Sequence, residues 1–401
     1  MKRIATILVL VFAAMIPMAC VEEINVSEET FDSALVVDAT ITNQQQRHQI
    51  YLSRTYQFED DGPAAETGAQ VLVSGNGVTY RFDESEVPGV YVSSTEFAAQ
   101  SGIDYTLQIN TSDGSVYTSV AKQLTNNVGI ENIYVQRENN DDDVNGMSIY
   151  IDSYNPGGDS QFYRYEYEET FKIVAPLWRD QDAIVIEGYP FCTVGLTERP
   201  EEQRICFRTE TSNTTNLFTT ANLSEDRVTR HLVHFVQSDD YKISHRYSLL
   251  ARQYVHSQEV FEYLETLDSF IQEGSLFSQI QPGFVPGNIS SETNPNQMVI
   301  GYFEVASVTE KRVFFNYVDF YPNDLLPPYI STCRIRSPGR FPEHQDKSEM
   351  CGPLIRAIER RTKVFLEVNE GSDFFPFQMV PRVCGDCTAI GRTNPPDFWV
   401  E

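Results

Sequence analysis

Short hydrophobic segments with strand character recur along the first third of this chain and constrain its fold more than any other feature. Turn signals such as Gly75-Asn76-Gly77, Pro88-Gly89 and Asp113-Gly114 separate several of them. The segments are 35–41, 48–52, 70–73, 78–82, 90–92, 105–109 and 116–120. Short strands with a turn every eight to twelve residues or so are typical of an immunoglobulin-like sandwich. We therefore predict such a β-sandwich over residues 34–126.

The remaining residues, 127–401, predict a second and larger β domain. Strands are expected at 130–136, 147–154, 162–174, 232–236, 245–255, 298–305, 312–320 and 364–368. One helix is predicted at about 258–273, because Ser257 is a suitable N-cap and apolar residues then recur at helical spacing. The stretch 180–216 has no clear periodicity. The predicted fold is mainly β, with an N-terminal immunoglobulin-like sandwich, a larger β-sandwich domain with one helix, and a disulfide-rich C-terminal segment.

The first twenty residues have the pattern of an export signal. Lys2 and Arg3 precede an apolar run over 4–16, which is too short to cross a bilayer. Residues 17–20 resemble the lipobox of bacterial lipoproteins, which implies a lipoprotein signal peptide at 1–19 and a membrane anchor formed by lipid on Cys20. Pro17 stands where that motif usually has Leu. Ordinary secretion, with Cys20 free or in a disulfide, is the alternative.

Residues 20–33 are acidic and predict a tether between the anchor and the first domain. Glu22 and Glu23 directly behind the cysteine resemble the surface-export signals of Bacteroidota lipoproteins, although a solvated linker would have the same composition. The whole chain has a formal net charge of −27. This charge argues against nucleic acid as a partner and against electrostatic binding to anionic lipid.

The chain has seven cysteines, and an even set remains once Cys20 is set aside. In an oxidising compartment such a set favours disulfides. The candidates are Cys192, Cys206, Cys333, Cys351, Cys384 and Cys387. We expect a local Cys192–Cys206 bridge and two bridges among the other four. Two alternatives remain for the Cys384-Gly-Asp-Cys387 motif, namely a redox pair or half of a zinc site with Cys333 and Cys351.

One acidic loop has part of the pattern of a calcium site. Asp141, Asp143 and Asn145 would supply oxygen ligands, Gly146 would allow the sharp turn, and Asp152 falls where a bidentate carboxylate usually lies. The same residues also suit an ordinary β-hairpin turn. Apart from this calcium candidate, we expect no cofactor.

Catalytic motifs are missing from the sequence. None of the six histidines lies in an HExxH pattern, and neither a GxSxG elbow nor a Walker loop is present. We therefore predict that the protein is not an enzyme. Tyr163, Tyr165 and Tyr167 share one face of a strand and could form a platform for a sugar or peptide, or else half of a sandwich core.

A series of segments resembles the Bacteroidota lipoproteins of domain-of-unknown-function family 4249. The segments that carry the resemblance are 35–37, 52–54, 245–254, 274–277, 281–282, 286–289, 299–303, 311–314, 384–387, 391 and 395–399. Members are typically encoded beside TonB-dependent outer-membrane receptors. The resemblance therefore implies a lipid-anchored, surface-exposed outer-membrane protein that assists such a receptor in taking up a peptide, glycan or chelate. The alternative is a structural or adhesive cell-surface lipoprotein without a transporter partner.

Overall fold

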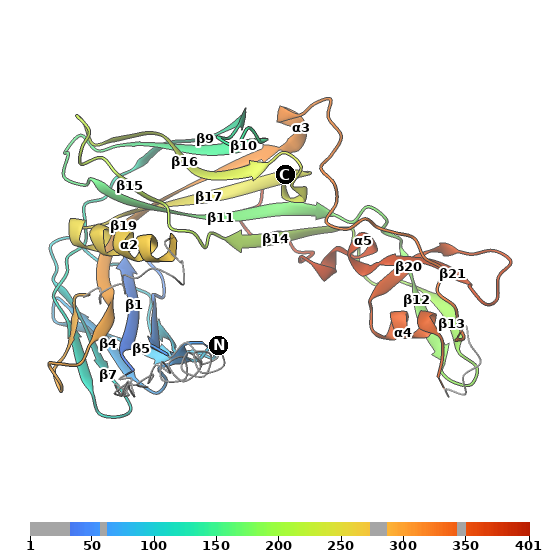
Figure 1. Ribbon diagram of the computed structural model, residues 1–401, viewed down its shortest axis with the longest axis horizontal. Coiled ribbons are helices and arrows are strands. Elements are labelled where there is room, and N and C mark those ends of the chain that lie inside the picture. The colour runs from blue at the N-terminus through green and yellow to red at the C-terminus, as the bar shows by residue number, and fades with distance from the viewer. Residues whose placement is uncertain (1–32, 57–61, 273–286, 343–349) are drawn as a thin grey trace, which may run out of the picture.

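The computed structural model describes residues 33–56, 62–272, 287–342 and 350–401. The chain is mainly β, as predicted. Figure 1 shows three parts: a first body at the lower left, a second body above it, and an arm that projects to the right. Within the described residues, every helix is too short or too polar to cross a lipid bilayer.

The first body is a single sheet that curls around one apolar core. Its strands are β1 (Leu35–Thr42), β2 (Gln49–Arg54), β3 (Ala64–Ala65), β4 (Gln70–Gly75), β5 (Val78–Glu84), β6 (Val90–Ser93), β7 (Tyr105–Asn110), β8 (Val116–Ser119), β18 (Ile289–Ser291) and the first half of β19 (Val299–Asn316). The sheet order is β19-β1-β2-β6-β5-β4-β7-β8-β18, with β3 beside β2. The seven segments expected between residues 34 and 120 all form strands.

The two ends of this curled sheet are joined by one asparagine side chain. The Asn288 amide donates to the Phe303 carbonyl at 2.7 Å, and the Phe303 N–H donates to Asn288 Oδ1 at 2.8 Å. Gly287 lies so close to β19 that an added Cβ would stand 1.6 Å from the Gly301 carbonyl oxygen. The first body is therefore almost closed on itself, which leaves few free strand edges.

The structure of β19 differs from two expectations. The two separate strands expected at 298–305 and 312–320 are one strand, and the first domain does not end at the expected boundary. It is one continuous strand that pairs in parallel with β1 from Val299 to Ala306 and then antiparallel with β17 from Ser307 to Asn316. Residues 34–126 therefore do not complete the first body, because β18 and β19 come from far along the chain. Local sequence patterns do not encode a pairing between segments so distant from each other.

The second body consists of two packed layers (Figure 1). One layer contains β14 (Ile205–Thr211), β11 (Phe162–Val174), β17 (Arg246–Val255) and the second half of β19, with β15 (Leu217–Thr219) beside β11. The other has the order β16 (Arg227–Gln237), β10 (Asn145–Tyr154), β9 (Ile130–Asn139). The short elements η1 (Tyr241–Ile243) and α3 (Tyr317–Phe320) also belong to this body. Apolar side chains between the layers form its core.

Helix α2 (Gln258–Gln272) confirms the predicted helix, and it lies between the two bodies in Figure 1. The Val260 N–H donates to the Ser257 hydroxyl at 3.4 Å, as expected for an N-cap. Val260, Phe261 and Tyr263 are buried. The predicted helix end at about 273 lies outside the described residues.

A buried polar cluster lies where the two bodies meet. Glu304 on β19 shares a 2.7 Å hydrogen bond with His256 Nδ1 and accepts a 2.9 Å bond from the Thr40 hydroxyl. Burial alone would raise the pKa of Glu304, but these contacts and the nearby Arg164 guanidinium lower it to about 2. An ionised carboxylate therefore connects strands of the first body to the end of β17.

The arm comprises the described residues 176–204, 327–342 and 350–389. Its elements are β12 (Gln181–Glu187), β13 (Thr193–Glu198), α4 (Pro353–Glu359), β20 (Lys363–Val368), β21 (Phe377–Pro381), α5 (Arg382–Gly385) and η2 (Cys387–Ala389). The strands form two separate two-stranded sheets, β12-β13 and β20-β21. The stretch 180–216, expected to be irregular, thus contains β12, β13 and β14. Many side chains of the β12-β13 hairpin stay partly exposed, so the usual alternation of apolar and polar residues is weak there.

Candidate functional site

The predicted lipid anchor and tether cannot be placed in this fold. Cys20 and nearly all of residues 20–33 lie outside the described residues. The described chain starts at Ser33, two residues before β1. The anchor therefore stays a prediction from the sequence.

The acidic loop forms a hairpin turn between β9 and β10. The Asn140 carbonyl accepts the Asp143 N–H, and Asn139 donates to Asp143 Oδ1 at 2.7 Å. Asn145 Oδ1 accepts a 3.2 Å bond from the Tyr321 hydroxyl. These contacts correspond to the alternative interpretation of this loop as a β-hairpin.

Asp152 lies far from the other three predicted calcium ligands. It lies seven residues beyond Asn145 on the same extended strand, which places it about 23 Å from the turn. Its Oδ1 accepts the Arg230 N–H at 2.7 Å instead. Across the described part of the chain, no three His, Cys, Asp or Glu side chains converge in a metal-binding arrangement. The structure therefore does not bring together Asp141, Asp143, Asn145 and Asp152.

The tyrosine stripe lies inside the second body, which corrects its interpretation as an exposed ligand platform. Tyr163 and Tyr165 are fully buried, and Tyr167 is half-buried. The Tyr163 hydroxyl donates to Asp226 at 2.7 Å and the Tyr165 hydroxyl donates to Gln253 at 3.0 Å. Burial raises the pKa of both phenols well above the ordinary value. The sequence showed which residues share a face, but not that a second layer covers it.

Two histidines of the covering layer pack on this stripe. The rings of Tyr165 and His231 lie 4.5 Å apart, and those of Tyr167 and His234 lie 4.2 Å apart. Burial lowers the pKa of both His231 and His234 to about 4, so both side chains are neutral at pH 7. These contacts describe a packed aromatic core, which was the alternative interpretation of the stripe.

All six downstream cysteines form disulfides, but the pairing differs from the expected one. The bridges are Cys192–Cys351, Cys206–Cys387 and Cys333–Cys384. The local Cys192–Cys206 bridge is wrong, and only Cys333–Cys384 joins two of the four C-terminal cysteines. Cys384 and Cys387 bond to different partners, so the CxxC motif is neither a disulfide pair in itself nor half of a zinc site. Sequence proximity misled the prediction, because the tertiary fold places Cys192 of the β12-β13 hairpin beside Cys351, and Cys206 of β14 beside Cys387.

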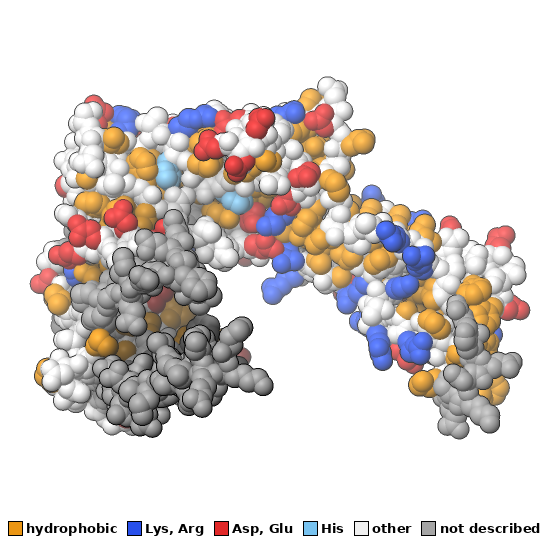
Figure 2. Space-filling model, viewed as in Figure 1, with side chains coloured by type: hydrophobic (Ala, Val, Ile, Leu, Met, Phe, Trp, Pro, Cys, Tyr) orange, Lys and Arg blue, Asp and Glu red, His pale blue; other side chains and the backbone are white. Residues whose placement is uncertain are grey.

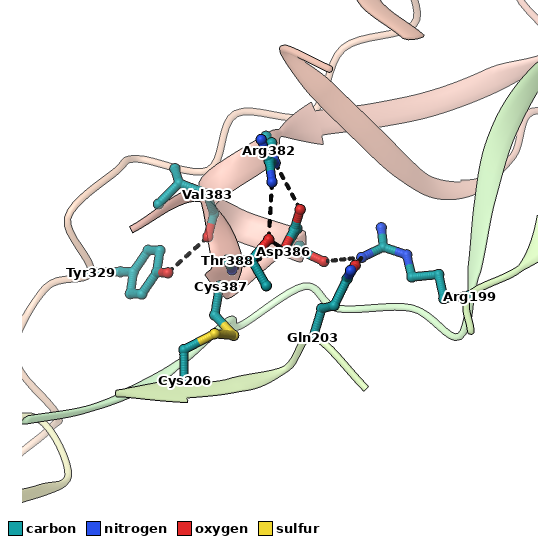
Figure 3. Close-up of a disulfide and its surroundings, with 10 residues drawn as sticks. Arg199, Gln203, Cys206, Tyr329, Arg382, Val383, Asp386, Cys387 and Thr388 are labelled. Atoms are coloured by element: carbon teal, nitrogen blue, oxygen red, sulfur yellow. Dashed lines mark hydrogen bonds and ion pairs between the residues drawn. A yellow bond between two sulfur atoms is a disulfide. The ribbon is translucent and has the colours of Figure 1, made fainter. Parts of the chain in front are cut away.

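Figure 3 shows the joint where the arm meets the second body. The Cys206–Cys387 bridge connects β14 to η2. Beside it, Arg382 Nε contacts Asp386 Oδ2 at 2.7 Å, and the Thr388 N–H donates to Asp386 Oδ1 at 2.9 Å. Burial opposes ionisation of Asp386, but these bonds lower the pKa of its carboxyl below the ordinary value. The disulfide thus crosses the joint, and charge-assisted hydrogen bonds hold the arm segment 382–388 that contains Cys387.

A second arginine, Arg199, lies near the same joint and connects the end of β13 to the C-terminal segment of the arm. Arg199 Nη1 donates to Gln203 Oε1 at 3.1 Å and to the Gly385 carbonyl at 2.8 Å, and its Nη2 lies 3.5 Å from Asp182 (Figure 3 shows Arg199 and Gln203). A cleft of about 730 Å³ lies beside these residues. Both basic and acidic side chains line this cleft. The basic ones are Arg199, Arg361, Lys363 and Arg382, and the acidic ones are Asp182, Glu198, Glu201, Glu359 and Asp386. This joint is a structural fastening, and we assign no catalytic role to it.

The free end of the arm exposes an apolar surface that sequence reasoning missed. We call it the tip patch; its members are Ile186, Tyr189, Phe191 and Met350, which are between 56 % and 64 % exposed. Tyr189 and Phe191 lie in the turn between β12 and β13, and Met350 directly precedes Cys351. The run Ile-Glu-Gly-Tyr-Pro-Phe at 186–191 was the available signal, since large apolar residues are unusual in an exposed turn.

A set of exposed arginines, the arginine strip, also lies on the arm. Its members are Arg334, Arg336, Arg356, Arg360 and Arg361. None of them forms an ion pair with the carboxylates that the structure describes. Figure 2 shows Lys and Arg side chains gathered over this part of the arm with hydrophobic side chains between them. The signal in the sequence was the density of arginine between residues 334 and 361 in a strongly acidic chain.

Together these features define a class of protein: two connected β bodies with a disulfide-fastened arm that exposes aromatic and basic side chains. The family model described as Domain of unknown function (DUF4249) matches residues 21–312. The chain belongs to this family, which confirms the family inferred from the resemblance. The match covers both bodies almost completely and ends within β19, before the C-terminal half of the arm. No curated protein shows significant similarity to the chain.

Proposed function

We propose that this protein is a lipid-anchored accessory protein of a TonB-dependent outer-membrane transporter, held at the cell surface, where it assists in capturing or taking up a ligand. Membership of the DUF4249 family is the observation that carries the proposal. The resembling lipoproteins are typically encoded beside TonB-dependent receptors. The ligand would be a peptide, glycan or chelate.

The disulfides support a location outside the cytoplasm. Three bridges join segments that are 159, 181 and 51 residues apart in the sequence. Such bridges form and persist in oxidising compartments, to which the export signal at residues 1–20 would deliver the chain. From Cys20 to Ser33 the tether could extend at most about 45 Å, enough to hold the first body clear of lipid headgroups.

The described surface supports a binding role rather than catalysis. The Glu304 cluster connects the two bodies, and the Asp386 cluster holds residues 382–388 of the arm in place. The tip patch and arginine strip, by contrast, are exposed, and the arginine side chains of the strip form no ion pair with the carboxylates that the structure describes. We therefore assign the function to recognition and positioning.

Two measurements in the native organism test this proposal. Metabolic labelling with a clickable palmitate analogue should label the wild-type protein and leave Cys20→Ser unlabelled. Affinity purification of the labelled protein from detergent-solubilised outer membranes should recover a large TonB-dependent barrel in comparable amounts.

Each possible failure has a distinct meaning. Equal labelling of the wild type and Cys20→Ser would contradict the lipid anchor. Labelling without any recovered barrel would contradict the transporter association and favour the structural or adhesive alternative. Surface exposure is checked separately by adding protease to intact cells, which should degrade the protein.

A further inference from the structure

A disulfide restrains the backbone beside the tip patch at the end of the arm. Phe191 and Met350 directly precede Cys192 and Cys351, whose Cα atoms lie 5.7 Å apart in a disulfide. The Cα atoms of Phe191 and Met350 therefore lie within about 13 Å of each other. Apolar residues gathered in this way on an exposed surface indicate an interaction site.

The backbone beneath the patch is already fixed. Both half-cystines are buried in a small cluster with Ile355, which packs against Phe341 and two valines of the hairpin. A preformed aromatic surface loses little conformational entropy on binding, and Tyr and Phe are common anchors of protein interfaces. A rigid tip of this kind suits a protein partner better than a fluid lipid surface.

The arginine strip makes the charge distribution of the chain asymmetric. Residues 334–363 contain eight Lys and Arg against four Asp and Glu, whereas the whole chain has a net charge of −27. The net charge of the chain repels an acidic partner, whereas this locally basic part of the arm attracts it. Such an asymmetry orients the encounter between two proteins.

The same charges disfavour a second copy of this chain as the occupant. In a symmetric contact between two copies, the strip of one copy would face the strip of the other, and like charges repel. A protein that presents carboxylates around an apolar recess fits both the patch and the strip.

We propose that the tip patch and the arginine strip form the surface through which this chain docks on its outer-membrane partner, whose matching surface is an apolar recess rimmed by Asp and Glu. The inference rests on the proposed function, because the partner is the barrel that co-purifies with the wild-type protein. It adds the location of the contact and the chemistry of the partner's surface.

The test compares variants of the full chain expressed in the native organism. Tyr189→Ser with Phe191→Ser should lower the amount of co-purified barrel at least tenfold. The matched control, Tyr51→Ser with Val78→Ser, removes two similarly exposed apolar side chains from the first body and should leave recovery unchanged. Arg356→Glu with Arg360→Glu should also lower recovery at least tenfold, and recovery with the wild type should fall as NaCl is raised. Intact-mass measurement of three disulfides and circular dichroism verify that each variant is folded.

A photo-cross-linking amino acid at position 191 identifies what lies against the tip. A cross-link to the barrel that is lost in Arg356→Glu with Arg360→Glu supports the docking surface. Cross-links to lipid or to a second copy overturn it, and so does unchanged barrel recovery in Tyr189→Ser with Phe191→Ser. These results leave the proposed function standing if the wild type still recovers the barrel. Absence of the barrel from the wild-type purification contradicts the proposed function itself.

Discussion

The first body and the arm are held together by different means. The first body has one continuous apolar core and no cysteine between residues 33 and 126 or between 287 and 306. The arm has three small apolar clusters, and every disulfide has at least one cysteine in it. Small folding units bury too little surface to offset the entropy lost on folding, so cross-links that restrict the unfolded chain make up the difference. The comparison suggests that the body folds around its core, whereas the arm depends on covalent closure.

Removing the bridge at the arm tip should have the largest effect. Cys192→Ser with Cys351→Ser removes a bridge between positions 159 residues apart, a separation for which the chain-entropy model gives at most about 5 kcal/mol; the other two bridges shorten the loop and lower this value. Hydrogen exchange followed by mass spectrometry should show faster exchange in arm peptides, with peptides of β1 to β8 unchanged. Equally faster exchange in both regions would contradict this difference, because it would mean that the arm and the first body unfold together.

A substitution at a glycine of the first body should destabilise that body rather than the arm. Gly301 on β19 has φ +119°, and an added Cβ would stand 1.8 Å from the Val37 carbonyl oxygen of β1. We expect Gly301→Ala to lower the free energy of unfolding by about 4 kcal/mol, measured by urea denaturation, because backbone strain and a clash between two strands combine.

Gly62 provides a matched control for this change. It has φ +120° with nothing within 4 Å of an added Cβ. Gly62→Ala therefore reports the conformational strain alone and should cost much less than Gly301→Ala. Similar losses for both variants would show that close packing of β1 on β19 contributes little.

Acid should weaken the junction between the two bodies and leave the disulfides of the arm intact. The folded pKa of Glu304 is about 2, below its ordinary value of 4.5. The carboxylate therefore stabilises the folded state above about pH 4.5, and this contribution of about 3 kcal/mol is lost as the pH falls toward 2. Urea denaturation at a series of pH values should show this loss in the wild type and a smaller one in Glu304→Gln. The same slope in both proteins would place the acid sensitivity elsewhere.

The smallest effect is expected for a hydrogen bond beside a disulfide of the arm. Thr388→Val removes a hydroxyl that donates to Asp386 at 2.5 Å and accepts from Arg382 at 2.9 Å. Because Cys206–Cys387 still fastens the joint, we expect a loss of about 1 kcal/mol in the unfolding free energy. The pKa of Asp386, followed by NMR titration, should rise toward its ordinary value. A loss as large as that of the disulfide variant would show that hydrogen bonding, not covalent closure, holds the joint.

Most elements of the fold could be predicted from local sequence patterns. The segments of the first body, the helix after Ser257 and the strand at 162–174 all lie where alternation, capping and β-propensity placed them. The presence of disulfides also followed from the even number of downstream cysteines. These features depend on neighbouring residues, whose spacing directly controls hydrogen bonding and the side chains that share a face.

The tertiary structure decided which distant segments these elements contact. It made β19 one strand shared by two bodies, covered Tyr163 and Tyr165 with a second layer, and joined Cys192 to Cys351 rather than to Cys206. It also left Phe191 and the arginine strip exposed on a projecting arm. Contacts between distant segments depend on the packing of the whole chain, which no local period records. The sequence by itself therefore determined the β elements and the family. The three-dimensional fold determined which side chains form the cores, which connect parts of the molecule and which stay exposed.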